Sequence, residues 1–379
     1  MMSNLAKPLG GHEKNDFIQV WRGIAAFLVI YFHLSARVPP EYLEMDSGPS
    51  LIFYSGKVGV LIFFVISGYL IVQSLQYSRN LASFYAKRIS RLWPLFALAV
   101  VLIFLFIQFV EPPIVPSGSK KFFTDPPTVL DLAGNIFFLN DLGFRWVDGV
   151  FWSILVELKF YMWIGLLAAL SPRNFVRHFA IAAIILSSLE FLVSLSGEPA
   201  LVLARQALNG MFVAHYLSFF AIGALLVTRR NPELLVLLIG IALVQTREEI
   251  VSDADFALAP TIIFVLALAA LVTLDRILLR SRIFLTIGDY SYSWYLFHQM
   301  IGLSIIKLTS TWLGYDPALA IALMATFALS VAASWTAEWR FRDPVYRLLF
   351  TLFRKLGLDR VGFGRGPAAN QVSPAGQIS

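Results

Sequence analysis

An arginine and a histidine lie in one apolar segment near the start of the sequence. Arg22 and His33 both fall within residues 17–37, which are enough to cross a bilayer core of about 20 residues. Eleven helical positions make three turns plus about 20°, so the two side chains project from one face, about 16 Å apart along its axis. Because an ionisable side chain inside a membrane costs about 2.5 kcal/mol or more, the pair predicts a functional, protein-lined cavity. The alternative is that Arg22 snorkels to the headgroups and His33 bonds a neighbouring helix.

A carboxylate is the candidate partner of His33. Glu157 lies about seven residues into the apolar segment 150–170, which crosses in the opposite direction from its own outer end. Measured from the outer membrane surface, the depth of Glu157 is similar to that of His33. A carboxylate beside an imidazole can hold the tautomer of the ring, which predicts an acid–base pair of Glu157 and His33. A structural salt bridge is the alternative.

Two arginines three positions apart form a second candidate site. Arg88 and Arg91 share one helix face between the second and third apolar segments, just inside the cytoplasmic surface, and such a fork suits a phosphate group. The alternative is an ordinary positive anchor at the cytoplasmic surface.

Weaker candidates surround these residues. The predicted cavity residues are Trp152, Ser153, Tyr292 and His298, and an interhelical hydrogen bond is the alternative for His298. His215 is a competing base. An anchor or part of a nucleotide-binding rim is predicted at Glu338, Arg340 and Arg342.

Several absences restrict the chemistry. The chain has no cysteine, so thiol catalysis, disulfides and cysteine metal sites are excluded. Its five histidines are scattered, and we predict no metal site. No phosphate-binding Gly-x-x-x-x-Gly-Lys-Ser/Thr loop occurs, which disfavours an ATP-driven pump.

The elements that must position these residues are apolar and long. The 379 residues are 58% hydrophobic and 14% charged, against about 25% charged in a soluble domain. This predicts an all-α fold: a polytopic integral membrane protein with about ten transmembrane helices around a polar cavity. The predicted spans are residues 17–37, 57–76, 92–110, 150–170, 178–195, 211–228, 233–246, 256–275, 290–310 and 317–339.

The spans define one predicted membrane domain, residues 16–345. Residues 1–15 form a cytoplasmic segment before it, and residues 346–379 form a cytoplasmic, partly disordered tail. Residues 111–149 are a long outward loop, in which 135–139 are a candidate re-entrant piece. A loop of this length is usually functional or disordered.

Basic residues collect in alternate loops. Arg79, Lys87, Arg88 and Arg91 follow the second span, whereas the loop after the first carries Glu41, Glu44 and Asp46. By the positive-inside rule both termini are cytoplasmic, and we expect a bacterial inner-membrane location. The same distribution accounts for the net charge of +6 without a nucleic-acid partner.

The motifs together resemble a known family. They are Arg22 with ten residues before His33, the run 59–70 containing Phe63-Phe64 and Ser67-Gly68, Arg88-Ile-Ser-Arg91, residues 151–157 and residues 290–298. In this order they resemble acyltransferase family 3, integral membrane proteins that include O-antigen and exopolysaccharide O-acetylases, nodulation-factor acetylases and macrolide acyltransferases. The resemblance implies that Arg22 and His33 are essential, that Arg88, Arg91 and Glu157 support them, and that the donor is a cytoplasmic acyl-CoA.

Two positions depart from the family pattern. Gln19 and Leu61 stand where relatives usually carry Asp, so the ion pairs of those carboxylates must be absent or replaced.

The predicted function is O-acyl transfer at a membrane. An acyl group, with acetyl expected and succinyl or a longer chain as alternatives, moves from acyl-CoA to a hydroxyl of a cell-surface, exported or lipid-linked carbohydrate. His33 acts as general base or, alternatively, carries the acyl group itself. We predict no permanently bound cofactor and a membrane-lipid environment. The rival is a multi-pass transporter or flippase of a glycan or lipid-linked sugar, which would also bury Arg, Glu and His.

Overall fold

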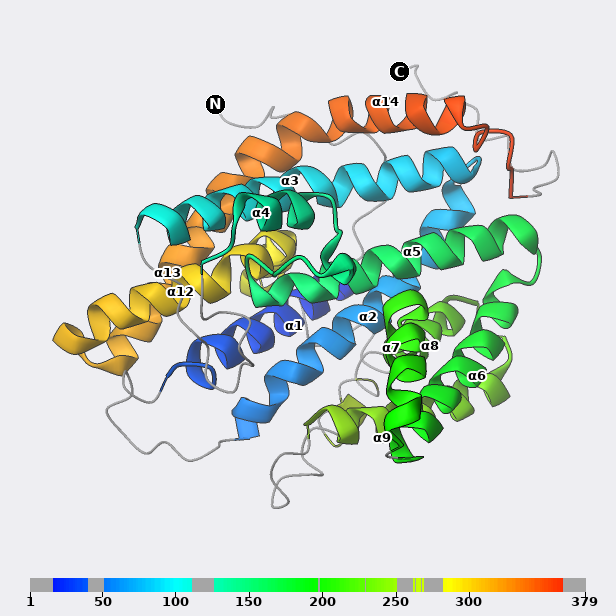
Figure 1. Ribbon diagram of the computed structural model, residues 1–379, viewed down its shortest axis with the longest axis horizontal. Coiled ribbons are helices and arrows are strands. Elements are labelled where there is room, and N and C mark those ends of the chain that lie inside the picture. Colours follow the sequence, from blue (N-terminus) through cyan, green and yellow to red (C-terminus); the bar gives the residue numbers. More distant parts are fainter. Residues whose placement is uncertain are drawn as a thin grey trace, which may run out of the picture.

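The chain is helical throughout the part that the structure describes. In the computed structural model this part comprises residues 16–39, 51–110, 126–196, 198–228, 230–250, 262, 264–266, 268 and 282–363. Apart from an isolated bridge between Asn80 and Gly362, its regular elements are helices (Figure 1). The predicted all-α class is confirmed for these residues.

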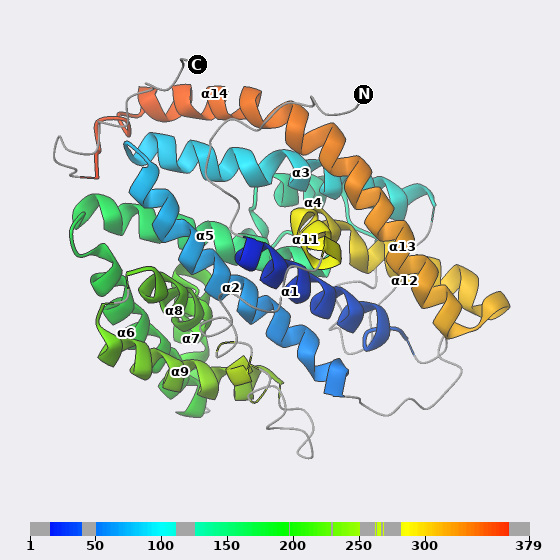
Figure 2. The same cartoon turned by 180° about the vertical axis from the view of Figure 1, so that it is seen from behind.

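One group of long helices surrounds the candidate site. These helices are α1 (Asp16–Ser35), α2 (Leu51–Tyr77), α3 (Leu81–Phe109), α5 (Trp152–Leu170), α12 (Ser291–Leu313) and α13 (Tyr315–Ala333). α1 packs against α2, α12 and the short helix α11 (Arg282–Asp289), and α3 packs against α5 (Figure 2). Charged residues of three of these helices, α1, α3 and α5, face a shared interior.

A second group lies beside the first. It comprises α6 (Phe175–Ser196), α7 (Val202–Phe212), α8 (Leu217–Thr228) and α9 (Pro232–Ile250), with α8 packed on α2 (Figure 1). α7 and α8 meet at a 65° bend. Val213 at the bend has φ 52°, a left-handed conformation that is unusual for a β-branched residue.

Fewer helices qualify as membrane spans than the sequence predicts. Among the described residues six helices are long and apolar enough to cross a membrane, or seven if the bent pair counts as one span. α9 and α12 coincide with the seventh and ninth predicted spans, but the apolar part of α9 is short and polar residues lower the mean hydropathy of α12. Most of the predicted span 256–275 lies outside the described residues. Several apolar helices remain, as in a multi-pass membrane protein.

Part of the long loop folds back along α3. α4 (Val129–Ile136) begins at a capping box of Thr128 and Asp131. The Trp93 indole of α3 donates to the Ile136 carbonyl at 3.0 Å, and Phe138 stacks on Phe96 with centroids 4.5 Å apart. These contacts lie midway along α3, so the segment folds back against that helix. A dip of residues 135–139 into the membrane stays a prediction.

The last helix extends beyond the predicted domain boundary. α14 (Trp339–Lys355) continues from α13 and packs along α3. The amides of Leu81 and Ala82 donate to the carbonyls of Val361 and Leu358. The boundary placed at residue 345 therefore falls inside a helix, and residues up to 363 pack against the start of α3.

Candidate active site

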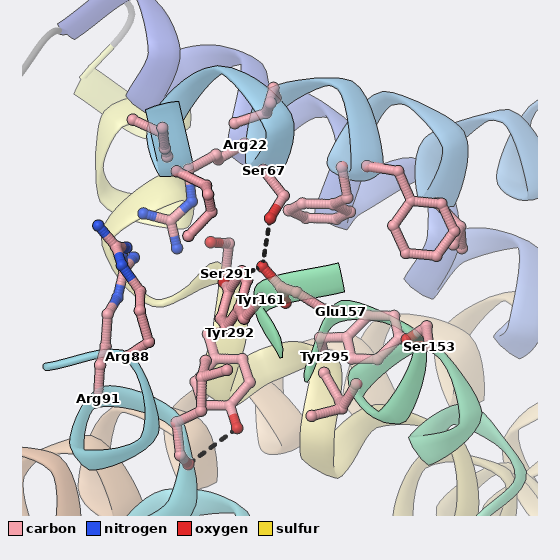
Figure 3. A pocket seen from close by; sticks show the side chains of 18 residues that line it. Arg22, Ser67, Arg88, Arg91, Ser153, Glu157, Tyr161, Ser291, Tyr292 and Tyr295 are labelled. Carbon is pink, nitrogen blue, oxygen red and sulfur yellow. Dashed lines mark hydrogen bonds between the residues drawn. The ribbon is translucent and has the colours of Figure 1, made fainter. Parts of the chain in front are cut away.

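A pocket lies between the long helices, and three arginines and a glutamate line it. Arg22 comes from α1, Arg88 and Arg91 from α3, and Glu157 from α5 (Figure 3). The pocket encloses about 90 Å³. Apolar side chains of α2 and α5 form much of its wall, and Ser67, Ser153, Tyr161, Ser291, Tyr292 and Tyr295 add hydroxyl groups.

The three guanidinium groups gather at one end of the pocket (Figure 3). Arg88 and Arg91 share a face of α3 because they are three residues apart. Arg88 Nε donates to Ser74 Oγ of α2 at 3.1 Å, and Arg22 Nη1 donates to Gln19 Oε1 at 3.3 Å. Gln19 in turn donates to Asp289 Oδ1 at 2.7 Å. Three delocalised cations at one end are chemically suited to a phosphate-bearing group.

Glu157 is held by hydrogen bonds from two helices. Ser67 Oγ of α2 donates to Glu157 Oε1 at 2.6 Å, and the Tyr161 hydroxyl donates to the same oxygen. Among the described residues none donates to Glu157 Oε2. The carboxylate is therefore fixed on the pocket wall with one oxygen left for a ligand.

His33 lies elsewhere, beside a second histidine. The rings of His33 and His298 have centroids 5.0 Å apart and an interplanar angle of 63°. His33 Nδ1 bonds the Val29 carbonyl at 2.9 Å, and His298 Nδ1 bonds the Tyr295 carbonyl at 2.7 Å. Because a carbonyl only accepts, each Nδ1 carries the hydrogen, and in the neutral ring each Nε2 carries a lone pair. His298 Nε2 is buried, and no residue in the described part of the chain forms a hydrogen bond with it.

The predicted pairing of Glu157 with His33 is wrong. Asp148, which immediately precedes the turn into α5, is buried and accepts a hydrogen bond from the Met300 amide at 3.2 Å. Met300 lies two residues beyond His298, so the chain enters α5 at about the level of the histidine pair. Nine residues further along, Glu157 is about 13 Å away along the axis. The depth estimate failed because the chain before α5 is buried at Asp148, beside Met300, rather than exposed at the surface of the protein.

Tyr295 separates the pocket from the histidine pair. Its side chain lines the pocket, and its ring lies 5.5 Å from that of His298. Its hydroxyl bonds Ser153 Oγ at 2.7 Å and the Val150 carbonyl at 2.9 Å. The arginines, Glu157, Tyr295 and the two histidines therefore follow one another along a single path.

Sequence comparison identifies the protein family. Residues 15–337 match the acyltransferase domain of family 3, which is most of the chain. The chain belongs to the acyltransferase 3 family. This membership supports an acyltransferase and not the transporter or flippase alternative.

The relatives of this acyltransferase carry matching names. It is 24% identical over 366 residues to the acyltransferase MdmB of Streptomyces mycarofaciens, covering 86% of this chain and 90% of that protein. It is 30% identical over 172 residues to a putative acetyltransferase of Acidianus two-tailed virus, covering 44% of each chain. It is 26% identical over 170 residues to an O-acetyl transferase of Shigella phage Sf6, covering 42% of this chain and 47% of that protein. The chain thus spans less than half the length of the two viral relatives. No solved structure matches.

The structure of this acyltransferase sorts the predicted site residues into two places. Arg22, Arg88, Arg91 and Glu157 line one pocket, together with Ser153 and Tyr292, whose hydroxyl donates to the Leu92 carbonyl at 2.9 Å. His33 and His298 form the histidine pair. Trp152 packs outside the pocket lining, against Phe64 and Tyr216.

Sequence reasoning missed two residues of this site. Ser67 is noted in the sequence only as part of the run 59–70, and Tyr161 is not selected as a site residue. Tyr161 lies four residues after Glu157, on the same helix face, and that spacing could have identified it. The Ser67 contact joins two helices and leaves no signal in the spacing.

His215 belongs to a different cluster. Buried Glu190 of α6 accepts hydrogen bonds from Arg205 Nε at 2.9 Å, Asn209 Nδ2 at 3.1 Å and His215 Nδ1 at 3.3 Å. We call these four residues the Glu190 cluster. It lies at the α7–α8 bend, so His215 is placed away from the pocket. Arg340 and Arg342 follow α13 on α14 and are not among the pocket-lining residues.

Proposed function

We propose that this protein transfers an acyl group, with acetyl expected, from acyl-CoA to a hydroxyl of a carbohydrate or lipid-linked glycan. The observation that carries the proposal is the order of groups along the path. Three arginines occupy one end, and the histidine pair lies beyond Tyr295, with about 16 Å along α1 between Arg22 and His33. A pantetheine arm is of comparable length.

The donor enters from the arginine end. Arg22, Arg88 and Arg91 bind its phosphates, because guanidinium groups hold phosphate oxygens through charge-assisted hydrogen bonds. Basic residues follow α2 in the sequence, so this end faces the cytoplasm under the positive-inside rule, where acyl-CoA is made. The acyl group then reaches the other half of the membrane while the nucleotide stays at the cytoplasmic end.

The histidine pair performs the transfer. His33 Nε2 takes the proton of the acceptor hydroxyl as its oxygen attacks the thioester carbonyl. The carbon–sulfur bond breaks, the CoA thiolate leaves, and the proton on His33 passes to that thiolate. General-base help of this kind contributes about 10² to 10⁴ in rate. The unpartnered His298 Nε2 accepts a hydrogen bond from the acceptor beside the reacting hydroxyl.

A covalent route uses the same residues. His33 Nε2 attacks the thioester carbonyl, the carbon–sulfur bond breaks and the CoA thiolate leaves. The acceptor oxygen then takes the acyl group from the ring, and the hydroxyl proton passes to the thiolate. Both routes require the lone pair on His33 Nε2.

Acetyl transfer in membranes tests the proposal. Membranes containing the protein are incubated with acetyl-CoA labelled in the acetyl group, and label is measured in lipid-linked and polymeric glycan. We expect His33→Gln to lose at least 100-fold of the transfer, while His178→Gln, at an exposed position of α6, retains it. Equal transfer by both variants would exclude His33 as the base. Absence of label with the wild type and with longer acyl-CoAs would contradict the donor assignment.

A further inference from the structure

We infer that Glu157 is a donor-binding residue, which accepts hydrogen bonds from the amide and hydroxyl groups of the pantetheine arm. The inference rests on the proposed function, because it takes acyl-CoA as the donor. It gives Glu157 a role different from the acid–base role that its sequence position suggests.

The charge of the pocket changes sign along its length. Figure 3 shows the guanidinium groups of Arg22, Arg88 and Arg91 at one end, and Glu157 between them and the hydroxyls of Ser153 and Tyr295. A carboxylate repels phosphate and attracts N–H and O–H groups. A ligand therefore fits best when its phosphates lie at the arginine end and a neutral, donor-rich segment passes Glu157. CoA has this order, because its phosphates precede an arm with two amide N–H groups and a hydroxyl.

The hydrogen bonds of Glu157 leave one oxygen for that segment. Ser67 and Tyr161 both donate to Oε1, which fixes the side chain between α2 and α5. Oε2 receives no hydrogen bond from the residues that the structure describes, and Glu157 is half-buried on the pocket wall. Oε2 is therefore open to the pocket, where a carboxylate oxygen forms strong charge-assisted hydrogen bonds with donors. A ligand N–H group is such a donor.

The same geometry separates Glu157 from the transfer step. Glu157 lies about 13 Å along α5 from Asp148, which is level with the histidine pair. The acceptor hydroxyl at His33 is therefore beyond its reach, whereas the middle of the pantetheine arm is within it.

Two ligands that differ only in the arm test this inference. CoA carries both phosphates and arm, and adenosine 3′,5′-bisphosphate carries phosphates without the arm. Affinities are measured by calorimetry on the full-length protein in detergent. We expect Glu157→Gln to weaken CoA binding by about tenfold or more, the effect of losing a hydrogen bond to a charged group. Binding of the bisphosphate should stay within about twofold.

Control variants make the result specific. Arg88→Gln should weaken both ligands, and Glu198→Gln, at an exposed position outside the pocket, should weaken neither. If Glu157→Gln does not fold, Glu157→Asp keeps the charge but shortens the side chain, and it should show the same loss for CoA alone.

Each other outcome overturns one of the two proposals. If the Glu157 variant loses affinity equally for both ligands, or for neither, the role of Glu157 is overturned and the donor assignment stays intact. A wild-type protein that binds neither ligand overturns the donor assignment and this inference with it.

Discussion

Two glutamates of this protein have opposite hydrogen-bonding environments. Glu190 accepts from Arg205 and Asn209 on one oxygen and from His215 on the other, and its side chain is fully buried. Glu157 accepts on Oε1 alone and lines a pocket with three arginines. Both lie in apolar helices, and neither sequence neighbourhood reveals the difference.

The difference distinguishes structure from binding. Glu190 has donors for both oxygens inside the protein, so it stabilises the α7–α8 bend and leaves nothing for a ligand. Among the described residues Glu157 has donors for one oxygen only, and it shares a cavity with three arginines. A cluster of charged side chains that lines a cavity indicates a ligand site.

The largest expected effect follows from removing Glu190. Glu190→Ala should lower the free energy of unfolding by about 3 kcal/mol, because it leaves Arg205 and His215 without their buried partner. Thermal unfolding in detergent measures the loss. Glu157→Gln is the matched comparison and should lose less than about 1 kcal/mol. Similar losses in the two variants would contradict the distinction between the glutamates.

An arginine from each site should show the opposite order of effects when CoA binding is measured instead of stability. Arg88→Gln should weaken CoA binding roughly 30-fold, the value of one charge-assisted hydrogen-bonding group, about 2 kcal/mol. Arg205→Gln should leave the CoA affinity of the folded protein unchanged. A CoA titration of both variants checks this, and weaker binding in Arg205→Gln would place the Glu190 cluster in the donor site.

The bend beside the Glu190 cluster should be strained. Val213 has φ 52°, and glycine adopts this conformation without a steric penalty. Val213→Gly should therefore stabilise the protein by about 1 kcal/mol in thermal unfolding. Val227→Gly, within α8, should destabilise it by a similar amount. Destabilisation by both would show that the side chain of Val213 contributes more than its backbone strain costs.

A third carboxylate gives the smallest expected effect. Burial alone would raise the pKa of Asp131, but hydrogen bonds from Thr128 and Arg145 outweigh it and lower that pKa below its usual value. A lowered pKa means that the charged form contributes stability above about pH 4 and that this contribution is lost as pH falls further. Asp131→Asn should cost about 0.5 kcal/mol at pH 7. The difference in unfolding free energy between the variant and the wild type should be smaller at pH 3. A difference that does not change with pH would exclude the charge of Asp131 as its cause.

The sequence was most informative about features that depend on the spacing of residues within a single helix. Spacing placed Arg88 and Arg91 on one face of α3, and apolar runs predicted most of the long helices. The fork faces the pocket because α3 has no other way to present both side chains between α1 and α5.

The sequence was least informative about relative depth and rotation of helices. The pairing of Glu157 with His33 assumed that residue 150 lies at the membrane surface. The segment that folds back along α3 places the start of α5 level with Met300 instead, and no pattern in residues 126–148 encodes that shift. The Ser67 contact of Glu157 and the His298 contact of His33 likewise depend on how separate helices are turned toward each other.

Two glycines determine which wall of the pocket is rigid. A Cβ on Gly68 of α2 would lie 2.0 Å from the Phe220 carbonyl oxygen, and a Cβ on Gly223 of α8 would lie 1.9 Å from that of Val65. The two backbones therefore touch directly, with no intervening side chain that could change rotamer and let them slide. Mechanically, α2 and α8 form one rigid unit, and Ser67 belongs to it. If the pocket widens for a long substrate, the helices that move are α3 and α12 on the opposite wall.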